Sequence, residues 1–413
     1  MESVPETILN SRAYSTMDLG KVTSNKLDSV RGGVNAVSDF NRMTVAKLKS
    51  LCDEANVKPP TGLNKAKLVD FVTNLAYSVG AGLPLAPPTE NQTIGELTDY
   101  EGVYMKLEEG QTWRDHIMEK GWATVPVPDF NSEETVNSLF SWLESLKIDG
   151  RPTGFRRDDR STWVNTNLPM NYHGIFKNYI GHEEFIWNTR EKCISIFQQI
   201  WMDGNGNPLK LLCSFDGACF LPQKERGRNK SWIHCDQSRY HGNNLSCIQG
   251  LVNLQENGPD DGGLLLLEGS QHHFEGYLNR HLLEGFSAHF KLDMGDPGLS
   301  SCRPIKICAP AGHILLWESR IAHCNVPPRK TGGLRMCIYV SMQPDVACSD
   351  KDRKRRIKTY EQGRMTGHWC YGEGFTIAAE HPRTYGNSFP MPKLITRGVT
   401  TDPKRRELIG YAD

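Results

Sequence analysis

The first residues that could do chemistry lie in the segment SWIHCDQS, residues 231–238. Side chains of a strand alternate between its two faces, so Trp232, His234 and Asp236 would share one face. An imidazole and a carboxylate that point the same way from one strand can act as two adjacent ligands of a divalent metal. The segment therefore predicts part of a metal site, and another ligand must come from elsewhere in the chain.

His323 is the best candidate for the distant ligand, because it follows the apolar stretch GHILLWES at a turn rich in Asn and Pro. Ligation by His234, Asp236 and His323 would occupy one face of an octahedron and leave the opposite positions open for a bidentate cosubstrate and dioxygen. This donor set suits iron(II) better than the thiolates expected of structural zinc. His272 and His273 are alternative distal ligands, ranked second because they follow the second strand too closely.

Arg335 opens the next apolar strand, on the same face as Cys337, Tyr339 and Ser341. A guanidinium buried in a barrel wall requires an anionic partner, and its planar fork matches the distal carboxylate of 2-oxoglutarate. We therefore predict that Arg335 anchors 2-oxoglutarate as a cosubstrate. Arg329 is the first alternative for this role.

Further polar residues could contribute to the same site. Gln249 lies on a neighbouring strand, where it could donate a hydrogen bond to the cosubstrate or be an ordinary solvated amide. The segment RMTGHWCYGEGF carries His368 and Trp369, which could line a substrate entrance or pack as ordinary core aromatics. The basic run KDRKRRIK, residues 351–358, is either a phosphate-binding or nuclear-import patch or the solvated face of a helix.

The elements that must position these residues are mainly short β-strands. From about residue 211 onward, apolar runs such as LSCIQGLVNLQ, GGLLLLEGS and LRMCIYVSM are separated by Gly, Pro, Asn and Asp. Such a series predicts a sandwich or barrel. Helical segments, including SEETVNSLFSWLESL and EEFIWNTREKCISIFQQIW, precede the strands. The fold class is therefore mainly β with helices packed around it.

Composition shifts divide the 413 residues into segments. Residues 1–40 are predicted to be a disordered tail, and residues 41–77 a helical hairpin whose apolar residues recur at helical spacing. Gly and Pro in residues 78–100 predict a linker. The catalytic domain is expected over residues 101–390, followed by a C-terminal tail at 391–413.

Charge and cysteine usage narrow the class of protein. The chain has 48 basic and 48 acidic residues, so an anionic partner would need a local basic patch. The 12 cysteines form no CxxC pair and several lie in apolar runs, which favours free thiols in a reducing compartment. No stretch is apolar enough to cross a bilayer or act as a secretory leader. We expect an intracellular protein, cytoplasmic or nuclear.

The motif set resembles the phytanoyl-CoA dioxygenase-like family of Fe(II)- and 2-oxoglutarate-dependent oxygenases, over roughly residues 110–380. The matching pieces are WIHCDQ, CIQGLVNLQENGPDDGGLLLLEGSQHHF, GHILLWESRIAHCNVP and LRMCIYVSMQP. The resemblance implies a double-stranded β-helix, or jelly roll, with His234, Asp236 and His323 as metal ligands and Arg335 as the cosubstrate anchor. Related halogenating enzymes replace the carboxylate with a small residue, so Asp236 favours hydroxylation.

Two departures from the family pattern lie outside this ligand set. The usual Pro-Gly-Ser-His turn is here the segment 268–272, Glu-Gly-Ser-Gln-His, and the usual Gly-Asp before the fourth motif is Gly312-His313. The metal chemistry implied by the resemblance is unaffected by either change, because neither alters a ligand.

The N-terminal hairpin is similar to the SAP module, a short helix–turn–helix unit associated with DNA. Its matching pieces are TVAKLKSLC, a turn at Gly62 and KAKLVDFV. Between Arg42 and Tyr77 there are six basic and three acidic residues, so a face that contacts DNA phosphates is possible. A small protein-interaction or packing module with solvated lysines is an equal alternative.

These features together predict a dioxygenase that uses Fe(II), 2-oxoglutarate and O₂ to hydroxylate an organic substrate, with release of succinate and CO₂. One alternative is a DNA-associated binding protein with a catalytically silent oxygenase-like domain. Retention of all four site residues argues against it, because a silent domain has no need for costly buried charge. The other alternative is a zinc hydrolase that uses the same His, Asp and His ligands.

Overall fold

The structure is a computed structural model of the whole chain. It describes residues 43–54, 65, 68–69, 72, 100–148, 150–169, 171–172, 174–176, 180–222, 232–238, 241–281, 290–329, 332–372, 374–379, 383–384, 387–388 and 399–412. The predicted N-terminal tail and nearly all of the predicted linker therefore lie outside the described residues. All of the predicted metal and cosubstrate residues lie within them.

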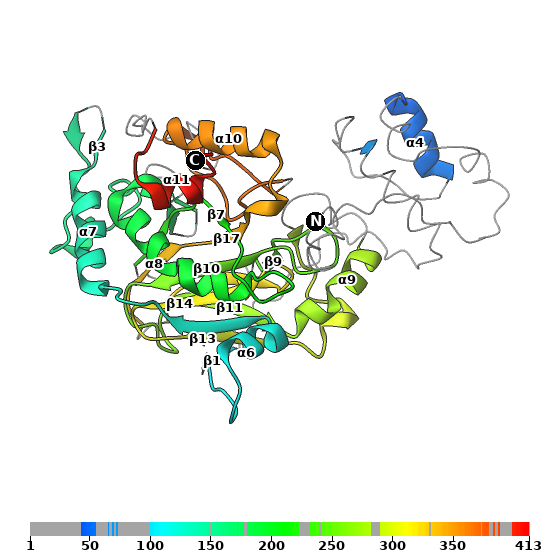
Figure 1. Cartoon of the computed structure of the whole chain (residues 1–413), viewed down its shortest axis with the longest axis horizontal. Helices are drawn as coiled ribbons and strands as arrows, with labels where there is room; N and C mark the ends of the chain where they lie inside the picture. The colour runs from blue at the N-terminus through cyan, green and yellow to red at the C-terminus, as the bar shows by residue number, and fades with distance from the viewer. Residues whose placement is uncertain are drawn as a thin grey trace.

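Two β-sheets form the core of the molecule (Figure 1). One has the order β1-β13-β11-β15-β9-β12, and the other has the order β2-β14-β10-β16-β8-β6-β5, with β17 pairing to β10 and to β7. The strands of the first sheet are β1 (Glu101–Tyr104), β9 (His234–Cys235), β11 (Gly263–Glu268), β12 (Phe290–Lys291), β13 (Arg303–Cys308) and β15 (His323–Val326). Those of the second are β2 (Trp122–Pro126), β5 (Asn171–Tyr172), β6 (Ile175–Phe176), β7 (Leu211–Cys213), β8 (Ala218–Leu221), β10 (Ile248–Asn253), β14 (His313–Glu318), β16 (Arg335–Tyr339) and β17 (Met342–Pro344).

Eight of these strands have jelly-roll connectivity. Successive strands β8, β9, β10 and β11 alternate between the two sheets, and β13, β14, β15 and β16 do the same on the return. The inner four strands of one sheet are thus β14-β10-β16-β8 and those of the other are β13-β11-β15-β9. This order is that of a double-stranded β-helix, so the mainly β architecture expected from the sequence is confirmed.

Strand alternation explains how the sheets pack. In β11 every side chain of the run Leu264–Leu267 is buried, because both faces of this strand are covered. Leu264 and Leu266 join an interior cluster that includes residues of both sheets, whereas Leu265 and Leu267 pack on the outside beneath α9. The interior between the sheets is therefore a packed core into which the site residues project.

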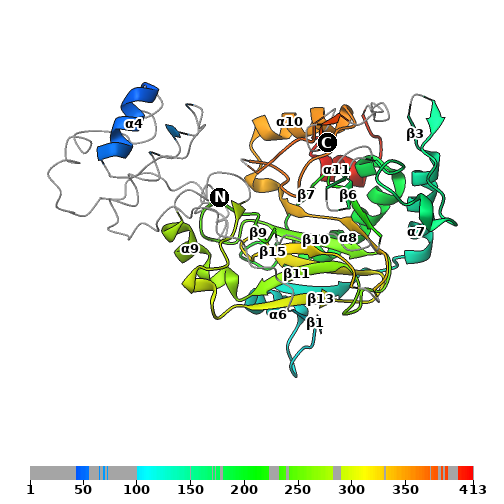
Figure 2. The same cartoon turned by 180° about the vertical axis from the view of Figure 1, so that it is seen from behind.

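Helices cover the outer faces of the sheets (Figures 1 and 2). Apolar residues of α7, α8 and α11 share one buried cluster with β7, β10 and β14, so this helical layer lies on the nine-stranded sheet. Residues of α9 pack with β9 and β11 of the other sheet. The helices are α4 (Val45–Glu54), α6 (Trp113–Lys120), α7 (Ser132–Ser145), α8 (Glu184–Ile200), α9 (Phe274–Arg280), α10 (Asp350–Glu361) and α11 (Pro403–Ile409). Short 3-10 helices are η1 (Arg160–Thr162), η2 (Ile180–His182), η4 (Ser270–His273), η5 (Pro297–Leu299) and η6 (Asp345–Ala347).

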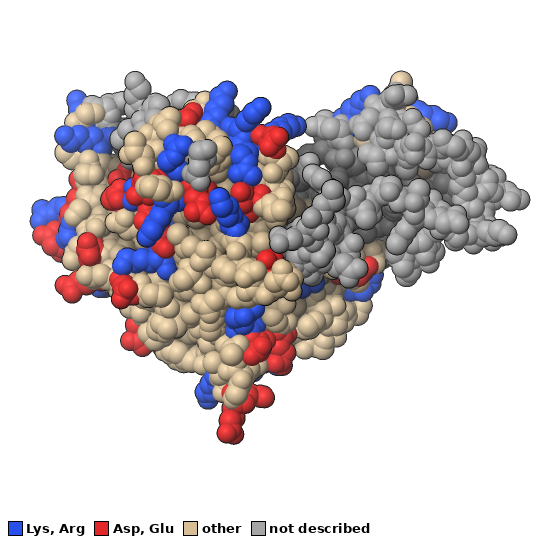
Figure 3. Space-filling view, viewed as in Figure 1, with Lys and Arg blue, Asp and Glu red and all other residues tan. Residues whose placement is uncertain are grey.

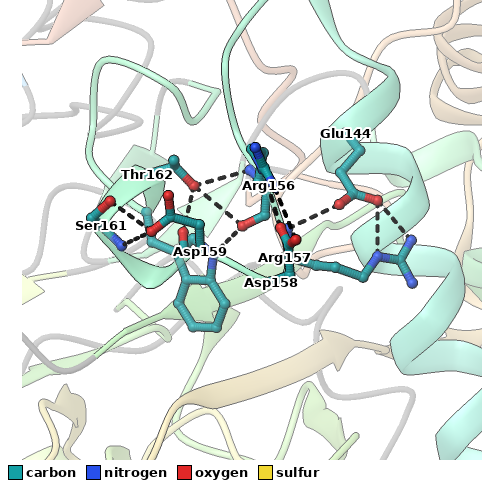
Figure 4. A network of polar contacts seen from close by, with 8 residues as sticks. Glu144, Arg156, Arg157, Asp158, Asp159, Ser161 and Thr162 are labelled. Carbon is teal, nitrogen blue, oxygen red and sulfur yellow. Dashed lines mark hydrogen bonds and ion pairs between the residues drawn. The ribbon is translucent and has the colours of Figure 1, made fainter.

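Two small hairpins complete the described structure, and one of them leads into a polar network (Figure 4). Arg157 donates to the Glu144 carboxylate at the end of α7, with Nε and Oε2 separated by 2.8 Å. The side chain of Asp159 caps η1 by accepting from the backbone N–H of Ser161. This network fixes the loop after α7 by polar contacts. The hairpins are β3 (Lys147–Ile148) with β4 (Arg151–Pro152), and β18 (Arg383–Thr384) with β19 (Asn387–Ser388).

The basic run at 351–358 is largely the helix α10, and part of it is structural. Arg356 is fully buried, and its guanidinium donates to backbone carbonyls of β7, α11 and the loop at Cys370. Arg353 pairs with Asp345 at 2.6 Å. The run is therefore not one continuous solvated face.

The structure describes part of each end of the chain. In the predicted hairpin, α4 is described and its Leu48, Leu51 and Cys52 side chains are buried, but most of the second predicted helix lies outside the described residues. The C-terminal segment 399–412 is not a simple tail, because α11 packs Leu408 and Ile409 into the helical cluster. The apolar pair and the Asp402 N-cap explain why this segment folds as a helix.

On the face that Figure 3 shows, Lys and Arg side chains lie among Asp and Glu side chains. Basic and acidic side chains alternate over the visible face of the helical layer and its surroundings. All 12 cysteines are described and all are free thiols, as the sequence predicts. Among the described residues, no helix combines the length and apolarity needed to cross a membrane.

Candidate metal centre

The predicted metal ligands lie on the adjacent strands β9 and β15 and in the segment directly after β9. His234 in β9 lies directly opposite His323 at the start of β15. Asp236 follows β9, and its backbone N–H donates to the carbonyl of Ser319 at 3.2 Å. Ile233 and Cys235 pack with Leu265, Leu267 and α9 in a buried cluster on the outer face of this sheet, here called the outer cluster. The alternation expected in this segment is therefore present.

The structure brings the three predicted ligands together. One ligand atom from each of His234, Asp236 and His323 lies within 4.8 Å of the others, and all three residues are buried. Nε2 of His323 is 3.0 Å from Oδ2 of Asp236, and Nε2 of His234 is 3.5 Å from Oδ1. Two imidazoles and one carboxylate at this spacing can hold one divalent cation, which stays a prediction for this chain.

Backbone carbonyls orient both imidazoles. Nδ1 of His234 is 3.0 Å from the carbonyl oxygen of Trp232, and Nδ1 of His323 is 3.0 Å from that of Ile321. A proton on Nδ1 that is donated to the carbonyl leaves the Nε2 lone pair directed at the cluster, which is the arrangement a metal ligand needs. The Trp232 ring also stacks on His234 with centroids 4.7 Å apart, and Trp317 lies 5.4 Å from His323.

The Asp236 carboxylate is also positioned by neighbours. Gln249 donates from Nε2 to Oδ2 at 3.0 Å, and His368 lies 3.8 Å from the same oxygen. Trp369 donates its indole N–H to the Asp236 backbone carbonyl at 3.0 Å. Without a metal, burial would raise the pKa of Asp236, but positive charge on protonated imidazoles of His368, His234 and His323 lowers it well below its usual range. This direction favours the ionised carboxylate, and a bound cation would replace the positive charge of the imidazoles when their Nε2 atoms become ligands.

Two neighbours of Asp236 had alternative roles in the sequence analysis. Gln249 is buried, so it is not a solvated amide, and its amide nitrogen contacts the carboxylate of Asp236, the predicted metal ligand. Contact of Gln249 with a cosubstrate stays a prediction. Trp369 is buried and its ring stacks on His241, so it packs in the core, while His368 lies beside the cluster.

Arg335 begins β16, as predicted, and its side chain is only 2% exposed. Within the described residues, neither of its terminal nitrogens has a hydrogen-bond partner. A guanidinium keeps its charge even when buried. A buried charge without a partner lowers the free energy of unfolding by roughly several kcal/mol. The structure therefore contains a cationic group whose natural partner is an anion that is not part of the described chain.

A small polar group surrounds this guanidinium within the interior cluster. Cys337 and Tyr339 follow on the same face of β16, and Cys219 lies directly opposite Cys337 on β8. Asn325, two residues after His323, donates to the Tyr339 hydroxyl at 3.3 Å. The strand that carries the distal histidine is thus connected by a side-chain hydrogen bond to the strand that carries Arg335.

The alternative site residues lie elsewhere. His272 is exposed and contacts Gln271, and His273 is 3.5 Å from the hydroxyl of Ser301. Arg329 is exposed, with its guanidinium over the Tyr100 ring at 4.5 Å. None of these three belongs to the buried cluster, so the structure favours the first choice of distal ligand and anchor.

Sequence reasoning missed several neighbours of the site. Trp317 contacts His323, and Cys219 lies opposite Cys337, but both stand in apolar strands with no motif of their own. Strand register is the signal that could have found them, because Trp317 lies opposite Gln249. A surface hollow of about 700 Å³ between α7 and α8 is separate from the site, since none of the predicted ligands lines it.

Known proteins resemble this chain at modest identity. No family model matches it. It is 29% identical over 294 residues to "Ava biosynthesis cluster protein O" of Aspergillus versicolor, covering 66% of this chain and 90% of that protein. It is 22% identical over 279 residues to "Putative phytanoyl-CoA dioxygenase" of Dictyostelium discoideum, covering 56% of this chain and 75% of that protein.

Solved structures also show a distant likeness. The non-heme alpha ketoglutarate dependent carbocyclase SnoK from nogalamycin biosynthesis is 14% identical, with a TM-score of 0.38. The match covers 66% of this chain and 98% of that one. Because that TM-score is low, the assignment of function depends on this chain's own residues.

Proposed function

We propose that this protein is an Fe(II)- and 2-oxoglutarate-dependent dioxygenase that hydroxylates an organic substrate and releases succinate and CO₂. The observation that carries the proposal is one jelly-roll interior containing both a buried His, Asp and His cluster and a buried guanidinium whose terminal nitrogens have no hydrogen-bond partner among the described residues. The similarity to a protein named as a phytanoyl-CoA dioxygenase supports it.

The residues fit both groups that this chemistry needs. Two imidazole nitrogens and one carboxylate suit iron(II), and three ligands leave coordination positions open. The unpaired Arg335 fork fits the distal carboxylate of 2-oxoglutarate. When bound, iron and 2-oxoglutarate would supply the oxidation of a substrate C–H bond by O₂.

The chain's own residues would supply binding, orientation and exclusion of water. His234, Asp236 and His323 would hold the metal, and Arg335 would fix the cosubstrate through its far carboxylate. Gln249 keeps the Asp236 carboxylate in one orientation through its hydrogen bond. The buried Trp317 beside His323 and the partly buried Trp232 stacked on His234 limit access of water to the cluster.

A zinc hydrolase using the same three ligands is less well supported. Such an enzyme needs an activated water and has no requirement for an unpaired guanidinium in the same interior. The name of the Aspergillus versicolor relative refers to a biosynthesis cluster, so small organic metabolites are the first class to include in a substrate screen.

For residues 41–77 we propose an SAP-like module that contacts DNA. The proposal is supported by the amphipathic α4, whose buried apolar residues alternate with the exposed Lys47 and Lys49. It is independent of the catalytic proposal.

The experiment for the catalytic proposal follows Fe(II) and 2-oxoglutarate binding under anaerobic conditions by metal-to-ligand charge-transfer absorbance, and then measures succinate after oxygen is admitted. Asp236→Ala should abolish iron binding and succinate formation, because an open site tolerates few missing ligands. His272→Ala is the control, since His272 is exposed and outside the cluster. Normal succinate formation by Asp236→Ala would disprove the ligand assignment, and zinc-dependent hydrolysis without 2-oxoglutarate would favour the hydrolase.

A further inference from the structure

A pair of cysteines faces the predicted anchor for the cosubstrate. Cys219 in β8 and Cys337 in β16 lie directly opposite one another on antiparallel strands, and both are fully buried. Both side chains belong to the interior cluster between the sheets. Directly opposed residues have Cα atoms about 4.5–5.5 Å apart, inside the range of about 4.4–6.8 Å that a disulfide requires.

The surroundings of this pair favour reaction of one thiol. Burial favours the neutral form, but the hydrogen bond from Cys219 and the positive charge of Arg335 hold the pKa of Cys337 below its usual value. The pKa of Cys219 is raised by its hydrogen bond to Cys337 and by burial. Cys337 is therefore the better nucleophile, and Cys219 is positioned to react with it second.

We propose that Cys219 and Cys337 are a thiol modification site that hydrogen peroxide converts to a disulfide next to the Arg335 guanidinium. The Cys337 sulfur attacks one peroxide oxygen, the O–O bond breaks, and sulfenic acid and water form. The Cys219 sulfur then attacks the sulfenic sulfur and releases a second water. Two thiols are oxidised by two electrons and one peroxide is reduced to two waters.

The consequence for the cosubstrate rests on the proposed function. A path that admits the carboxylate of 2-oxoglutarate to Arg335 also admits the smaller peroxide to the adjacent thiols. Bound 2-oxoglutarate should therefore slow the oxidation. The disulfide joins the strand of Arg335 to its neighbour, so it should displace the guanidinium fork and weaken 2-oxoglutarate binding.

The test begins with the full-length metal-free protein, treated with hydrogen peroxide and then with catalase. Wild type should lose about 2 Da per disulfide, and peptide mapping should join Cys219 to Cys337. After anaerobic reloading with Fe(II), the oxidised protein should bind 2-oxoglutarate at least about tenfold more weakly, and dithiothreitol should restore binding.

Matched variants make the result specific. Cys219→Ala and Cys337→Ala should lack the joined peptide, and peroxide should not lower 2-oxoglutarate affinity in Cys337→Ala, because that variant lacks the thiol that reacts first. Cys324→Ala should behave like wild type, because Cys324 is also buried but packs on the outer face of the sheet, beneath α9. Absence of the joined peptide in wild type would overturn the modification site, and a joined peptide with unchanged 2-oxoglutarate affinity would overturn its effect on the anchor. If reduced protein never binds 2-oxoglutarate, the proposed function fails, while the mass and mapping results still decide the disulfide.

Discussion

Two of the three buried arginines in the described residues, Arg356 in the helical layer and Arg335 in the jelly-roll interior, differ in whether their guanidinium nitrogens have hydrogen-bond partners. Arg356 in α10 is 0% exposed and Arg335 in β16 is 2% exposed. Every nitrogen of the Arg356 guanidinium donates to a backbone carbonyl, at distances from 2.5 to 3.2 Å. Both terminal nitrogens of Arg335 lack a partner among the described residues.

Burial alone therefore does not identify a functional charge. The partners of Arg356 lie in β7, α11 and the loop at Cys370, so its side chain cross-links segments that are distant in sequence. A satisfied buried cation of this kind stabilises the fold. An unsatisfied one costs free energy in the ligand-free protein, and an anionic ligand can recover that cost. The comparison predicts opposite effects for the two arginines on stability and on ligand binding.

The largest expected effect is on stability, from Arg356→Met. This change leaves four buried carbonyl groups without their donor, and each such group costs about 1–3 kcal/mol. We expect the free energy of unfolding to fall by about 3–5 kcal/mol in total, because some carbonyls will regain partners by relaxation. Urea unfolding followed by circular dichroism measures this change in the free energy of unfolding.

Lys354→Met is the matched control, because Lys354 is exposed on the same helix. Its free energy of unfolding should stay within about 0.5 kcal/mol of wild type. A similarly small change in Arg356→Met would break the comparison, since it would show that the satisfied guanidinium contributes little to the fold.

The next effect, on ligand binding, is expected from Arg335→Gln. Loss of the charge partner should weaken 2-oxoglutarate binding roughly a hundredfold, equivalent to about 2.7 kcal/mol, while the affinity for iron changes little. The free energy of unfolding should not fall, because the substitution removes an unpaired buried charge. Anaerobic titrations with iron and then 2-oxoglutarate give both affinities.

Arg329→Gln serves as the control for loss of an arginine near the same strand. Its guanidinium is exposed and contacts Tyr100, so 2-oxoglutarate affinity should be unchanged. If Arg335→Gln instead lost stability and kept its 2-oxoglutarate affinity, Arg335 would belong to the same structural class as Arg356.

The sequence predicted those parts of the site that depend on neighbouring residues of one segment better than those that depend on how separate strands pair. Alternation within residues 231–238 correctly placed His234 and Asp236 on one face, because that periodicity is local. His323 as distal ligand and Arg335 as anchor were predicted from motif and strand order and stay predictions, and the strands do place His323 opposite His234. Contacts that depend on register between strands, such as Gln249 with Asp236, were not predicted.

The same limit applies to the fold. The mainly β class followed from short apolar runs, but two features of the C-terminal region were missed. Residues 391–413 were predicted to be a tail, and α11 within them was not expected. This helix is short, and its stability depends on packing against α8, β7 and the other members of its buried cluster. The role of Arg356 was also hidden, because its partners are backbone carbonyls that carry no sequence signal.

A smaller effect is expected from Gln249→Leu, which tests a buried polar side chain that has a hydrogen-bond partner, as Arg356 does, but lies at the predicted site, as Arg335 does. Gln249 has a partner, but that partner is the predicted metal ligand Asp236. Removing the donor should weaken iron binding about tenfold, as losses of groups that orient metal ligands commonly do, and affect 2-oxoglutarate only through the metal. Gln271→Leu removes a buried amide outside the cluster and should leave the iron titration unchanged. Equal iron affinity in both variants would show that Gln249 has no role in orienting the carboxylate.

The smallest effect on catalysis is expected from deleting residues 1–85, because both arginines and the whole cluster lie in the described structure from residue 100 onward. The shortened chain should fold and decarboxylate 2-oxoglutarate within about twofold of wild type, since linkers carry few packing contacts.

The same deletion should weaken DNA binding, because the exposed Lys47 and Lys49 are removed. In the full chain, changing both lysines to Gln should reduce the slope of log affinity against log salt by about 2, one for each lost phosphate contact. Fluorescence anisotropy with labelled duplex at several salt concentrations measures that slope. An unchanged slope would assign residues 41–77 to protein interaction or packing, and a collapse of decarboxylation in the deletion would show that the N-terminal residues are needed by the region of Arg335.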